Sequence, residues 1–393
     1  MGEENADVID KLVPSLHVYC EMQGRIQLGI SLFGQVLPLY RKWVLESPDL
    51  TIGLTKLLVR QSFLYFRTNY FQQVEELINE VKPRLDELKS VDLSEFAFSR
   101  ALIWSFHDGF ETAEEAVLVI EQARNVAFQL DDDWLKGLTL LCLAENYHFR
   151  GRHKLSLPYF EQSIEAFEKI GEKRYKAFSL NNLGRAYFGI GQYKKAKNKV
   201  SEALAIREAF NDHVGINISR ISLAAIEIAL QNFGVASQYL HTSLDVCLKI
   251  SSVRTNYCQN LLGRLALNQG KYEEAKEWFR KNINLRKSKV DLAYMPHSLN
   301  GLAYICLLEE SYEQARGLLQ RSLAISEGTD FVDEKAEAFL YMAFLEHIDN
   351  PVEPDRAEHY YQQALATGKI MGAPPQALSH CILVDWAKFD FVH

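Results

Sequence analysis

The chain has 393 residues, of which 48% are hydrophobic and 24% are charged, and its formal net charge is −8. This composition is typical of a folded globular protein, the negative charge weighs against general nucleic-acid binding, and no uncharged apolar run reaches the roughly 18 residues of a membrane span. The acidic segment from Met1 to Asp10 lacks the basic and then apolar order of a secretion signal.

The first segment in chain order, residues 1–49, is expected to form a helical hairpin that caps the rest of the chain. Gly29 occupies the place of a small residue at which two antiparallel helices approach each other closely. We therefore interpret residues 1–49 as a first, atypical repeat.

Residues 50–372 carry a repeated pattern of helical hairpins. In one clear unit, Gly184 lies midway along a predicted first helix, Gly191 lies in a short turn, Tyr193 follows, and Ala196 comes three residues later. Small side chains let two antiparallel helices pack closely, and Gly or Asn adopts the left-handed backbone that ends a helix. The pattern therefore predicts a first helix, a turn and a second helix in each unit.

The small residue of the second helix recurs at nearly constant intervals of 39, 43, 40, 40, 39, 40 and 42 residues. The anchors are Val74, Ala113, Ser156, Ala196, Ala236, Ala275, Ala315 and Ala357. Seven near-equal steps predict eight hairpins, with a ninth at Gly29, and no Ser- or Gly-rich linker divides them. We expect an all-α fold, a right-handed superhelical solenoid of tetratricopeptide type with a period of about 40 residues.

The last segment, residues 373–393, is expected to close the open end of the solenoid. Pro374 and Pro375 precede a predicted final helix of about residues 376–388, whose apolar side chains recur at helical spacing. Repeat arrays need such a terminal cap because each repeat buries its apolar face only against its neighbours.

The sequence motifs predict no catalytic centre. Glu145 and His148 form an ExxH pair on a predicted helix, but a di-metal site would need a second pair, which the sequence lacks. The six cysteines are scattered without a CxxC pair, which is typical of buried thiols in a reducing cytoplasm. We predict a cytoplasmic protein with no enzyme activity, no cofactor and no metal ion. A hydrolase that uses Glu145 and His148 is the enzymatic alternative.

The concave side of the solenoid is the predicted binding surface, because first helices line it in such arrays. The position three residues before the small residue of each first helix gives an Asn row of Asn181, Asn260 and Asn300. The position just after that small residue gives an adjoining row of Arg185, Arg264 and Tyr304. Further polar side chains lie beside the two rows. The predicted site residues are Asn181, Asn260, Asn300, Asn182, Arg185, Arg264, Tyr304, Glu145 and His148. An Asn amide can pair with both polar groups of a peptide backbone, and Arg can bind a carboxylate or phosphate with two donors. The alternative is that the Asn side chains satisfy neighbouring helix ends or are merely hydrated.

The 183–323 stretch resembles tetratricopeptide repeats of the 40-residue kind, as found in kinesin light chains and in the sensor arrays of bacterial STAND-class signalling ATPases. A second stretch, from His17 to Arg25 and on through Gly29 and Phe33, resembles the helical pair that opens such sensor arrays. The resemblance implies a sensor that binds a ligand and thereby releases an attached ATPase module to oligomerise. The family's nucleotide-binding residues have no counterpart in this sequence.

Three binding roles follow from these observations. The chain is first interpreted as the sensing part of a STAND-type ATPase, with a peptide, a protein or a small-molecule inducer in its groove and a fused ATPase module as a further partner. The second interpretation is a free-standing peptide receptor that resembles quorum-sensing regulators. The third is a scaffold that joins two proteins. No membrane or nucleic-acid partner is expected.

Overall fold

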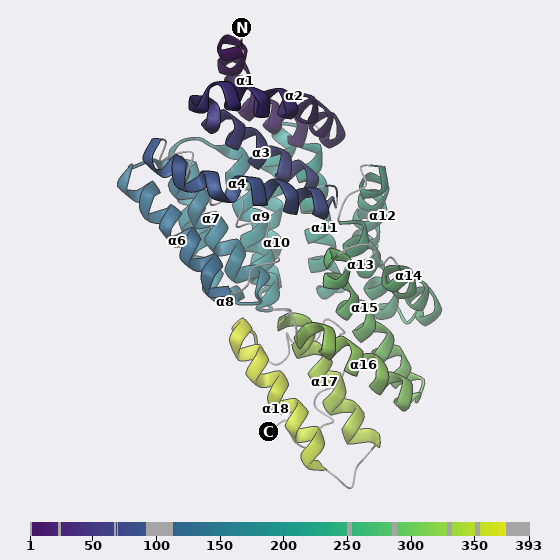
Figure 1. Ribbon diagram of the computed structural model, residues 1–393. Coiled ribbons are helices and arrows are strands. Elements are labelled where there is room, and N and C mark those ends of the chain that lie inside the picture. The colour runs from purple at the N-terminus through teal and green to yellow at the C-terminus, as the bar shows by residue number, and fades with distance from the viewer. Residues whose placement is uncertain are drawn as a thin grey trace.

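The computed structural model describes residues 2–22, 25–66, 68, 70–91, 113–249, 254–284, 289–327, 332–349 and 354–374. These parts of the chain form α-helices and one short 3₁₀ helix, and no strand occurs among them. Successive helices run antiparallel and stack into a curved array (Figure 1). The predicted all-α solenoid is confirmed.

The helices pair in chain order. Their bounds are Gly2–Met22 (α1), Ile26–Glu46 (α2), Pro48–Leu50 (η1), Thr51–Phe66 (α3), Phe71–Val91 (α4), Ala113–Gln129 (α6), Asp133–Phe149 (α7), His153–Lys169 (α8), Lys173–Gly189 (α9), Tyr193–Ala209 (α10), His213–Ala229 (α11), Phe233–Lys249 (α12), Thr255–Asn268 (α13), Tyr272–Asn284 (α14), Lys289–Leu308 (α15), Tyr312–Glu327 (α16), Val332–Asp349 (α17) and Pro354–Met371 (α18).

The predicted repeat anchors take one equivalent place in the hairpins. Ser156, Ala196, Ala236 and Ala315 each lie three residues after the start of a second helix, and all four are fully buried. Val74, Ala275, Ala357 and Gly29 occupy the same place in α4, α14, α18 and α2. Ala113 begins α6, and the first helix expected before it lies outside the described residues. The division of the chain at residues 49 and 372 remains a prediction, and most of the expected final helix is also outside the described residues.

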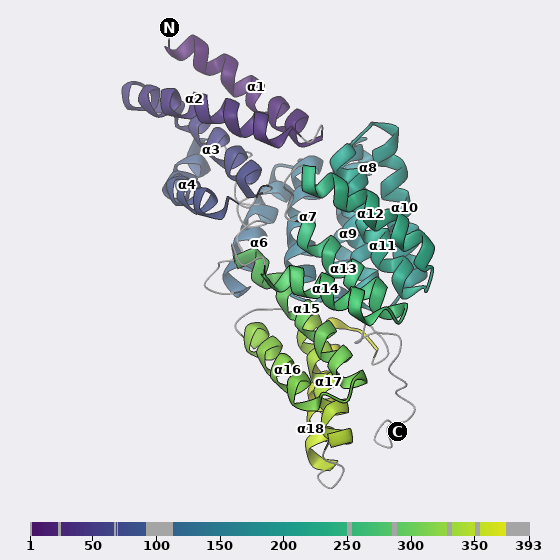
Figure 2. The ribbon, with the colours of Figure 1, turned by 90° about the vertical axis from the view of Figure 1, so that its right-hand side faces the viewer.

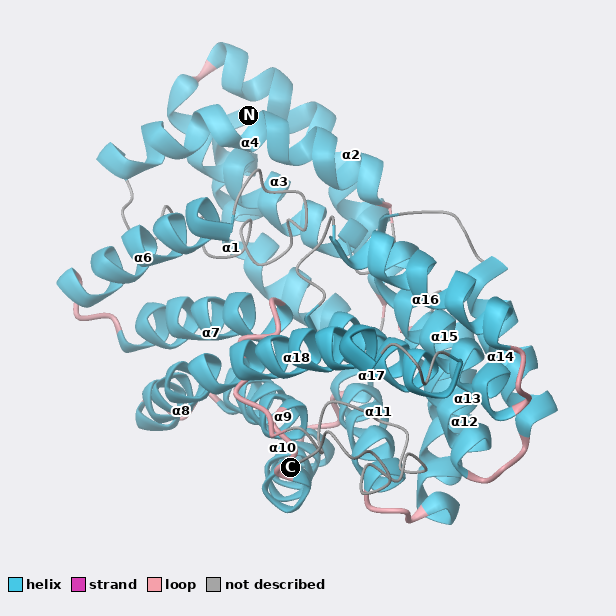
Figure 3. Cartoon of the chain, turned by 90° about the horizontal axis from the view of Figure 1, so that it is seen from below, coloured by secondary structure: helices cyan, strands magenta, loops and turns pink. Residues whose placement is uncertain are grey.

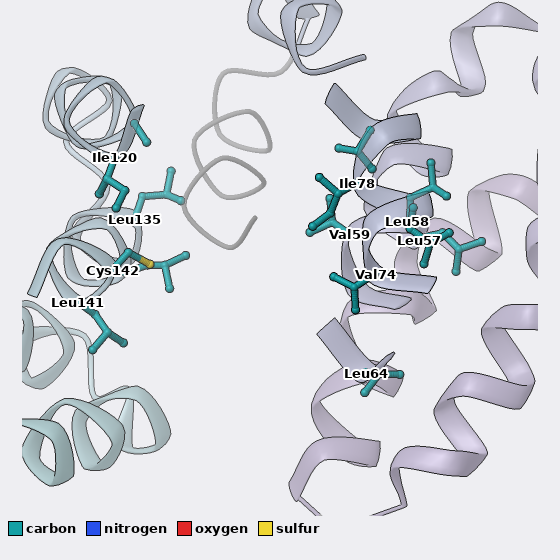
Figure 4. Packing of buried hydrophobic residues seen from close by; sticks show 14 of the residues in the cluster. Leu57, Leu58, Val59, Leu64, Val74, Ile78, Ile120, Leu135, Leu141 and Cys142 are labelled. Atoms are coloured by element: carbon teal, nitrogen blue, oxygen red, sulfur yellow. The ribbon is translucent and has the colours of Figure 1, made fainter. Parts of the chain in front are cut away.

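First helices carry most of the core. In α11, thirteen residues are buried, whereas five are buried in its partner α12. A first helix is packed by its own partner and by the hairpins on both sides, so it exposes less surface than a second helix. Figure 4 shows two regions of this core, with Ile120 beside Leu135 in one and Val59 beside Ile78 in the other.

The hairpin turns place one residue in the left-handed backbone region. Gly191 and Gly270 do so with φ of 76° and 74°, as the sequence predicts, and Asn211 does so with φ of 57°. Gln231 and Glu310 adopt the same conformation although neither is Gly or Asn. These two turns therefore hold backbone strain that a glycine would relieve.

Replacing Glu310 by Gly is expected to raise the free energy of unfolding by about 0.5–1 kcal/mol, since the relief of strain exceeds the added flexibility of the unfolded chain. The matched control is Gly270→Ala, which introduces the same strain and is expected to lower the free energy of unfolding by about 1 kcal/mol. Urea unfolding followed by circular dichroism measures both. Shifts of the two variants in the same direction would contradict the assignment of strain to these turns.

The array curls until its late helices meet its early ones. Seen from below, α17 and α18 lie across the middle of the curve described by α7 to α15 (Figure 3), and the N-terminal helices extend from the opposite end (Figure 2). Val332 at the start of α17 lies so close to Gly151 that a Cβ at Gly151 would fall 2.4 Å from the Val332 Cβ. The superhelix therefore brings together segments about 180 residues apart, at the α7–α8 turn and the start of α17.

Candidate ligand-binding surface

The predicted Asn row lies in the seams between successive first helices. Asn181, Asn260 and Asn300 are each at most 1% exposed. Asn181 Nδ2 donates to Ser222 Oγ at 3.4 Å, from α9 to α11, and Asn260 Nδ2 donates to Ser298 Oγ at 3.2 Å, from α13 to α15.

Asn300 continues the ladder from α15 to α17. Its Nδ2 donates to the main-chain oxygen of Glu334 at 3.0 Å and to Glu337 Oε2 at 3.2 Å. The three amides thus donate to groups on neighbouring first helices. A peptide that bound them would have to replace bonds that already hold the first helices together, and their role in ligand binding remains a prediction.

Arg264 and Tyr304, from the adjoining predicted row, are also buried. Arg264 binds Glu337 of α17 with two hydrogen bonds, Nη1 to Oε1 at 3.0 Å and Nη2 to Oε2 at 2.7 Å. Its Nε donates to Asn260 Oδ1, and its Nη2 lies 3.2 Å from His297 Nδ1. The ring centroids of Tyr304 and Tyr341 lie 5.2 Å apart. The fork of Arg264 is therefore already engaged by a protein carboxylate.

Glu145, Asn182 and Arg185 form the remaining part of the predicted site, which we call the inner cluster. Asn182 Nδ2 donates to Glu145 Oε1 at 2.9 Å, and Arg185 Nη1 donates to Asn182 Oδ1 at 3.4 Å. Glu145 and Arg185 keep part of their surface exposed. The Arg185 guanidinium lies 5.6 Å from the centre of the Phe149 ring, which is 53% exposed.

The inner cluster carries less negative than positive charge at neutral pH. Burial raises the pKa of the Glu145 carboxyl to about 7, while the nearby Arg185 and Arg254 guanidiniums and the hydrogen bond from Asn182 oppose that rise. Among the described residues, no carboxylate oxygen comes within ion-pair distance of Arg185. At neutral pH the inner cluster therefore holds one cation, Arg185, and a carboxyl that is ionised only in part, with the Arg254 guanidinium nearby.

His148, the last predicted site residue, lies in a different contact. Its Nδ1 is 2.9 Å from His153 Nδ1, and His153 Nε2 is 2.9 Å from Asp333 Oδ1 at the start of α17. Burial, and after it electrostatic interaction with His153 and Arg185, holds the pKa of His148 well below its usual range. We call His148, His153 and Asp333 the corner contact, because they join the α7–α8 turn to α17.

Sequence patterns did not identify Arg254, Glu337, His153 or Asp333 as site residues. His153 lies five residues from the predicted His148, whereas the pairs Arg264–Glu337 and His153–Asp333 meet only through the curvature of the superhelix and span 73 and 180 positions. No spacing rule relates such distant positions, so the sequence held no signal for these contacts.

The described residues contain no group of three or more His, Cys, Asp or Glu side chains placed to hold a metal ion. Over the same residues, no helix is both long enough and apolar enough to traverse a lipid bilayer.

Two family models, both described as tetratricopeptide repeat, match residues 137–209 and 257–289. The first match covers most of α7 and all of α8 to α10, and the second covers most of α13 and all of α14. The chain therefore contains tetratricopeptide repeats, as its resemblance predicted. A comparison with curated proteins found no match.

Solved structures share the fold over most of the chain. A Rap protein in complex with the competence and sporulation factor is 14% identical, with 88% of this chain and 98% of that one covered and a TM-score of 0.66. NprR in complex with its cognate peptide NprX is 14% identical, with 80% and 95% covered and a TM-score of 0.60. A STAND protein with a tetratricopeptide repeat sensor, from Pyrococcus horikoshii, is 14% identical, with 85% and 50% covered and a TM-score of 0.46. The first two likenesses establish the same overall solenoid fold.

Proposed function

We propose that this chain binds a peptide on the inner surface of its superhelix, at the inner cluster of Glu145, Asn182 and Arg185. The observation that carries the proposal is Arg185, a partly buried cation whose hydrogen bonding to the described residues is a single 3.4 Å bond to Asn182. A buried or half-buried charge normally has a partner of opposite charge. A ligand would supply that partner.

The chemistry of the cluster suits a peptide. Asn182 offers an amide beside the guanidinium, and an amide can exchange its internal bonds for those of a peptide backbone. Phe149 offers an exposed ring for an apolar side chain. The two structures with TM-scores of 0.66 and 0.60 are complexes with the competence and sporulation factor and with a cognate peptide, and the chain covers almost all of their length.

Among the binding roles that the sequence suggests, the peptide receptor has this additional support. The STAND sensor role adds a fused ATPase module, and the reading frame upstream of Met1 tests it directly, because a nucleotide-binding module should be encoded there. We further propose that the protein acts in the cytoplasm and through binding alone, without a catalytic step of its own.

The proposal is tested by selection from a displayed library of random peptides of five to eight residues, followed by titration calorimetry with the selected peptides. Arg185→Ala is expected to weaken binding about tenfold to a hundredfold, the range for a lost hydrogen bond to a charged group. The control is Arg124→Ala on α6, since Arg124 pairs locally with Glu121 on a second helix. Failure to select any peptide, or equal affinity of Arg185→Ala and the unaltered protein, would refute the proposal.

A further inference from the structure

We propose that Cys247 and Cys258 form a redox-sensitive thiol pair, which a peroxide oxidises to a disulfide at the junction between two successive hairpins. Cys247 lies in the last turn of α12 and Cys258 in the first turn of α13, so the disulfide joins the second helix of one hairpin to the first helix of the next. The pair shares no residue with the inner cluster, and its chemistry does not depend on whether the inner surface binds a peptide.

The two sulfurs meet in the interior of the array. Both cysteines are 0% exposed and belong to a core cluster that α11, α12 and α13 share. Their thiols are hydrogen-bonded to each other, and Nδ2 of Asn217 on α11 also donates to Cys247 Sγ at 3.3 Å. The sequence gave no sign of the pair, because residues 248–257 separate the two cysteines. Two sulfurs in contact need only a short approach to reach the bonding distance of a disulfide.

The polar surroundings give the two sulfurs different roles. Cys247 Sγ accepts the hydrogen bond from Asn217, which favours a thiolate at that sulfur. The hydrogen bond to Cys247, together with burial, raises the pKa of the Cys258 thiol far above its usual range, and the Arg254 guanidinium opposes that rise. Cys258 therefore keeps its proton, and Cys247 is the sulfur that attacks the oxidant.

Hydrogen peroxide suits a buried pair because it is small and uncharged, whereas a bulky disulfide reagent would have to open the core. The Cys247 thiolate attacks one peroxide oxygen, so that an S–O bond forms, the O–O bond breaks, and the released hydroxide takes up the proton that Cys247 gave up. The Cys258 sulfur then attacks the Cys247 sulfur. An S–S bond forms, the S–O bond breaks, and the leaving hydroxyl takes the Cys258 proton. The two thiols thus lose two electrons, and the peroxide becomes two water molecules.

The place of the pair gives the disulfide a consequence for the whole array. Both cysteines lie at helix ends, where local opening of the chain admits peroxide. Small rotations between successive hairpins set the pitch of the superhelix. The disulfide fixes the rotation between the α11–α12 hairpin and the α13–α14 hairpin, and it restrains the unfolded chain between its two cysteines. Oxidation therefore stiffens one junction of the superhelix.

Peptide mapping by mass spectrometry tests the modification in the full chain. The protein is treated with hydrogen peroxide, its remaining thiols are blocked with N-ethylmaleimide, and it is digested with trypsin without reduction. We expect the tryptic peptides 221–249 and 255–264 to appear as one linked pair, which dithiothreitol splits into its two components. The control Cys142→Ala, which removes another buried thiol, should still give the linked pair. Cys258→Ala, or Cys258→Ser should the alanine variant not fold, should give none and should leave a sulfenic acid on Cys247 that dimedone traps.

Hydrogen exchange measures the stiffening. In the oxidised protein, amide exchange over residues 240–249 and 255–264 should slow at least about tenfold relative to the reduced protein, and peroxide should not slow it in the Cys258 variant. Oxidation of either cysteine without the linked pair, a link to any other cysteine, or no oxidation of the two thiols would overturn the proposed pair. A linked pair with unchanged exchange in both segments would overturn its role in stiffening the junction.

Discussion

Replacing Glu337 by Ala is expected to lower the free energy of unfolding by about 3–5 kcal/mol, the range measured when one partner of a buried ion pair is removed. Glu337 is 2% exposed and accepts two bonds from Arg264, one from Asn300 and one from Tyr341. The variant would leave the Arg264 guanidinium buried opposite a vacated carboxylate. Since one side chain connects α13, α15 and α17, the loss should destabilise the whole C-terminal half of the array.

Urea unfolding followed by circular dichroism measures the effect, with Asp349→Asn as the control. Asp349 lies on the same helix and pairs with Arg316 of the adjacent α16 at the exposed edge, so its loss should change the free energy of unfolding by less than about 1 kcal/mol. The double variant Arg264→Leu/Glu337→Leu should recover most of the stability, because it buries no unpaired charge. A small effect of Glu337→Ala, similar to that of Asp349→Asn, would contradict a stabilising role for this buried network.

Replacing Asp333 by Asn is expected to loosen two distant segments together, the α7–α8 turn and the start of α17. Asp333 accepts a hydrogen bond from His153 Nε2, and Val332 beside it lies against Gly151. Loss of a hydrogen bond to a charged group should speed amide hydrogen exchange of both segments about tenfold to a hundredfold. In the control Asp349→Asn, exchange at the α7–α8 turn should be unchanged.

The same contact should weaken in acid. His148 Nδ1 and His153 Nδ1 face each other at 2.9 Å, so one of them must donate and the other must accept. A proton added to His148 places a positive charge on a buried ring, which destabilises the contact. Because the folded structure lowers the pKa of His148 from its ordinary 6.5, the contribution of the contact to stability is complete above about pH 6.5 and falls progressively as the pH falls below it.

Hydrogen exchange measured by mass spectrometry at pH 7.5 and pH 5.5, after correction for intrinsic exchange rates, tests this pH dependence. The unaltered protein should lose protection at residues 146–154 and 332–340 together at the lower pH, whereas Asp333→Asn should show little further loss. Faster exchange in only one of the two segments, or in neither, would contradict a contact that spans the superhelical turn.

Much of the fold could be predicted from the sequence, because the physics of a helical hairpin is local. Ala196 and Ala236 mark the close approach of two helices, and their spacing sets the register of the repeats. Gly191 and Gly270 mark turns that need a left-handed residue. Gln231 and Glu310 show the limit of that rule, because the backbone hydrogen bonds that close their turns hold two residues in a conformation that their side chains disfavour.

The candidate site could be predicted only in part. Counting along a first helix identifies the residues on one face of that helix, but the curvature of the array decides whether that face is open to solvent or packs against the next helix. Here Asn181 and Asn260 face the next helix, while Arg185 keeps part of its surface exposed. Curvature accumulates from small rotations between hairpins, and no single repeat encodes it. For the same reason, the spacing of residues in the sequence does not predict the pairs Arg264–Glu337 and His153–Asp333.

The central claim, that the inner surface of the superhelix receives a peptide, is tested most directly by a crystal structure of the chain with a selected peptide bound. We expect peptide density against the first helices, with Asn182 bonded to the peptide backbone and a peptide carboxylate on the Arg185 guanidinium. Density for the peptide on the outer second helices, with Arg185 and Asn182 unchanged, would contradict the claim.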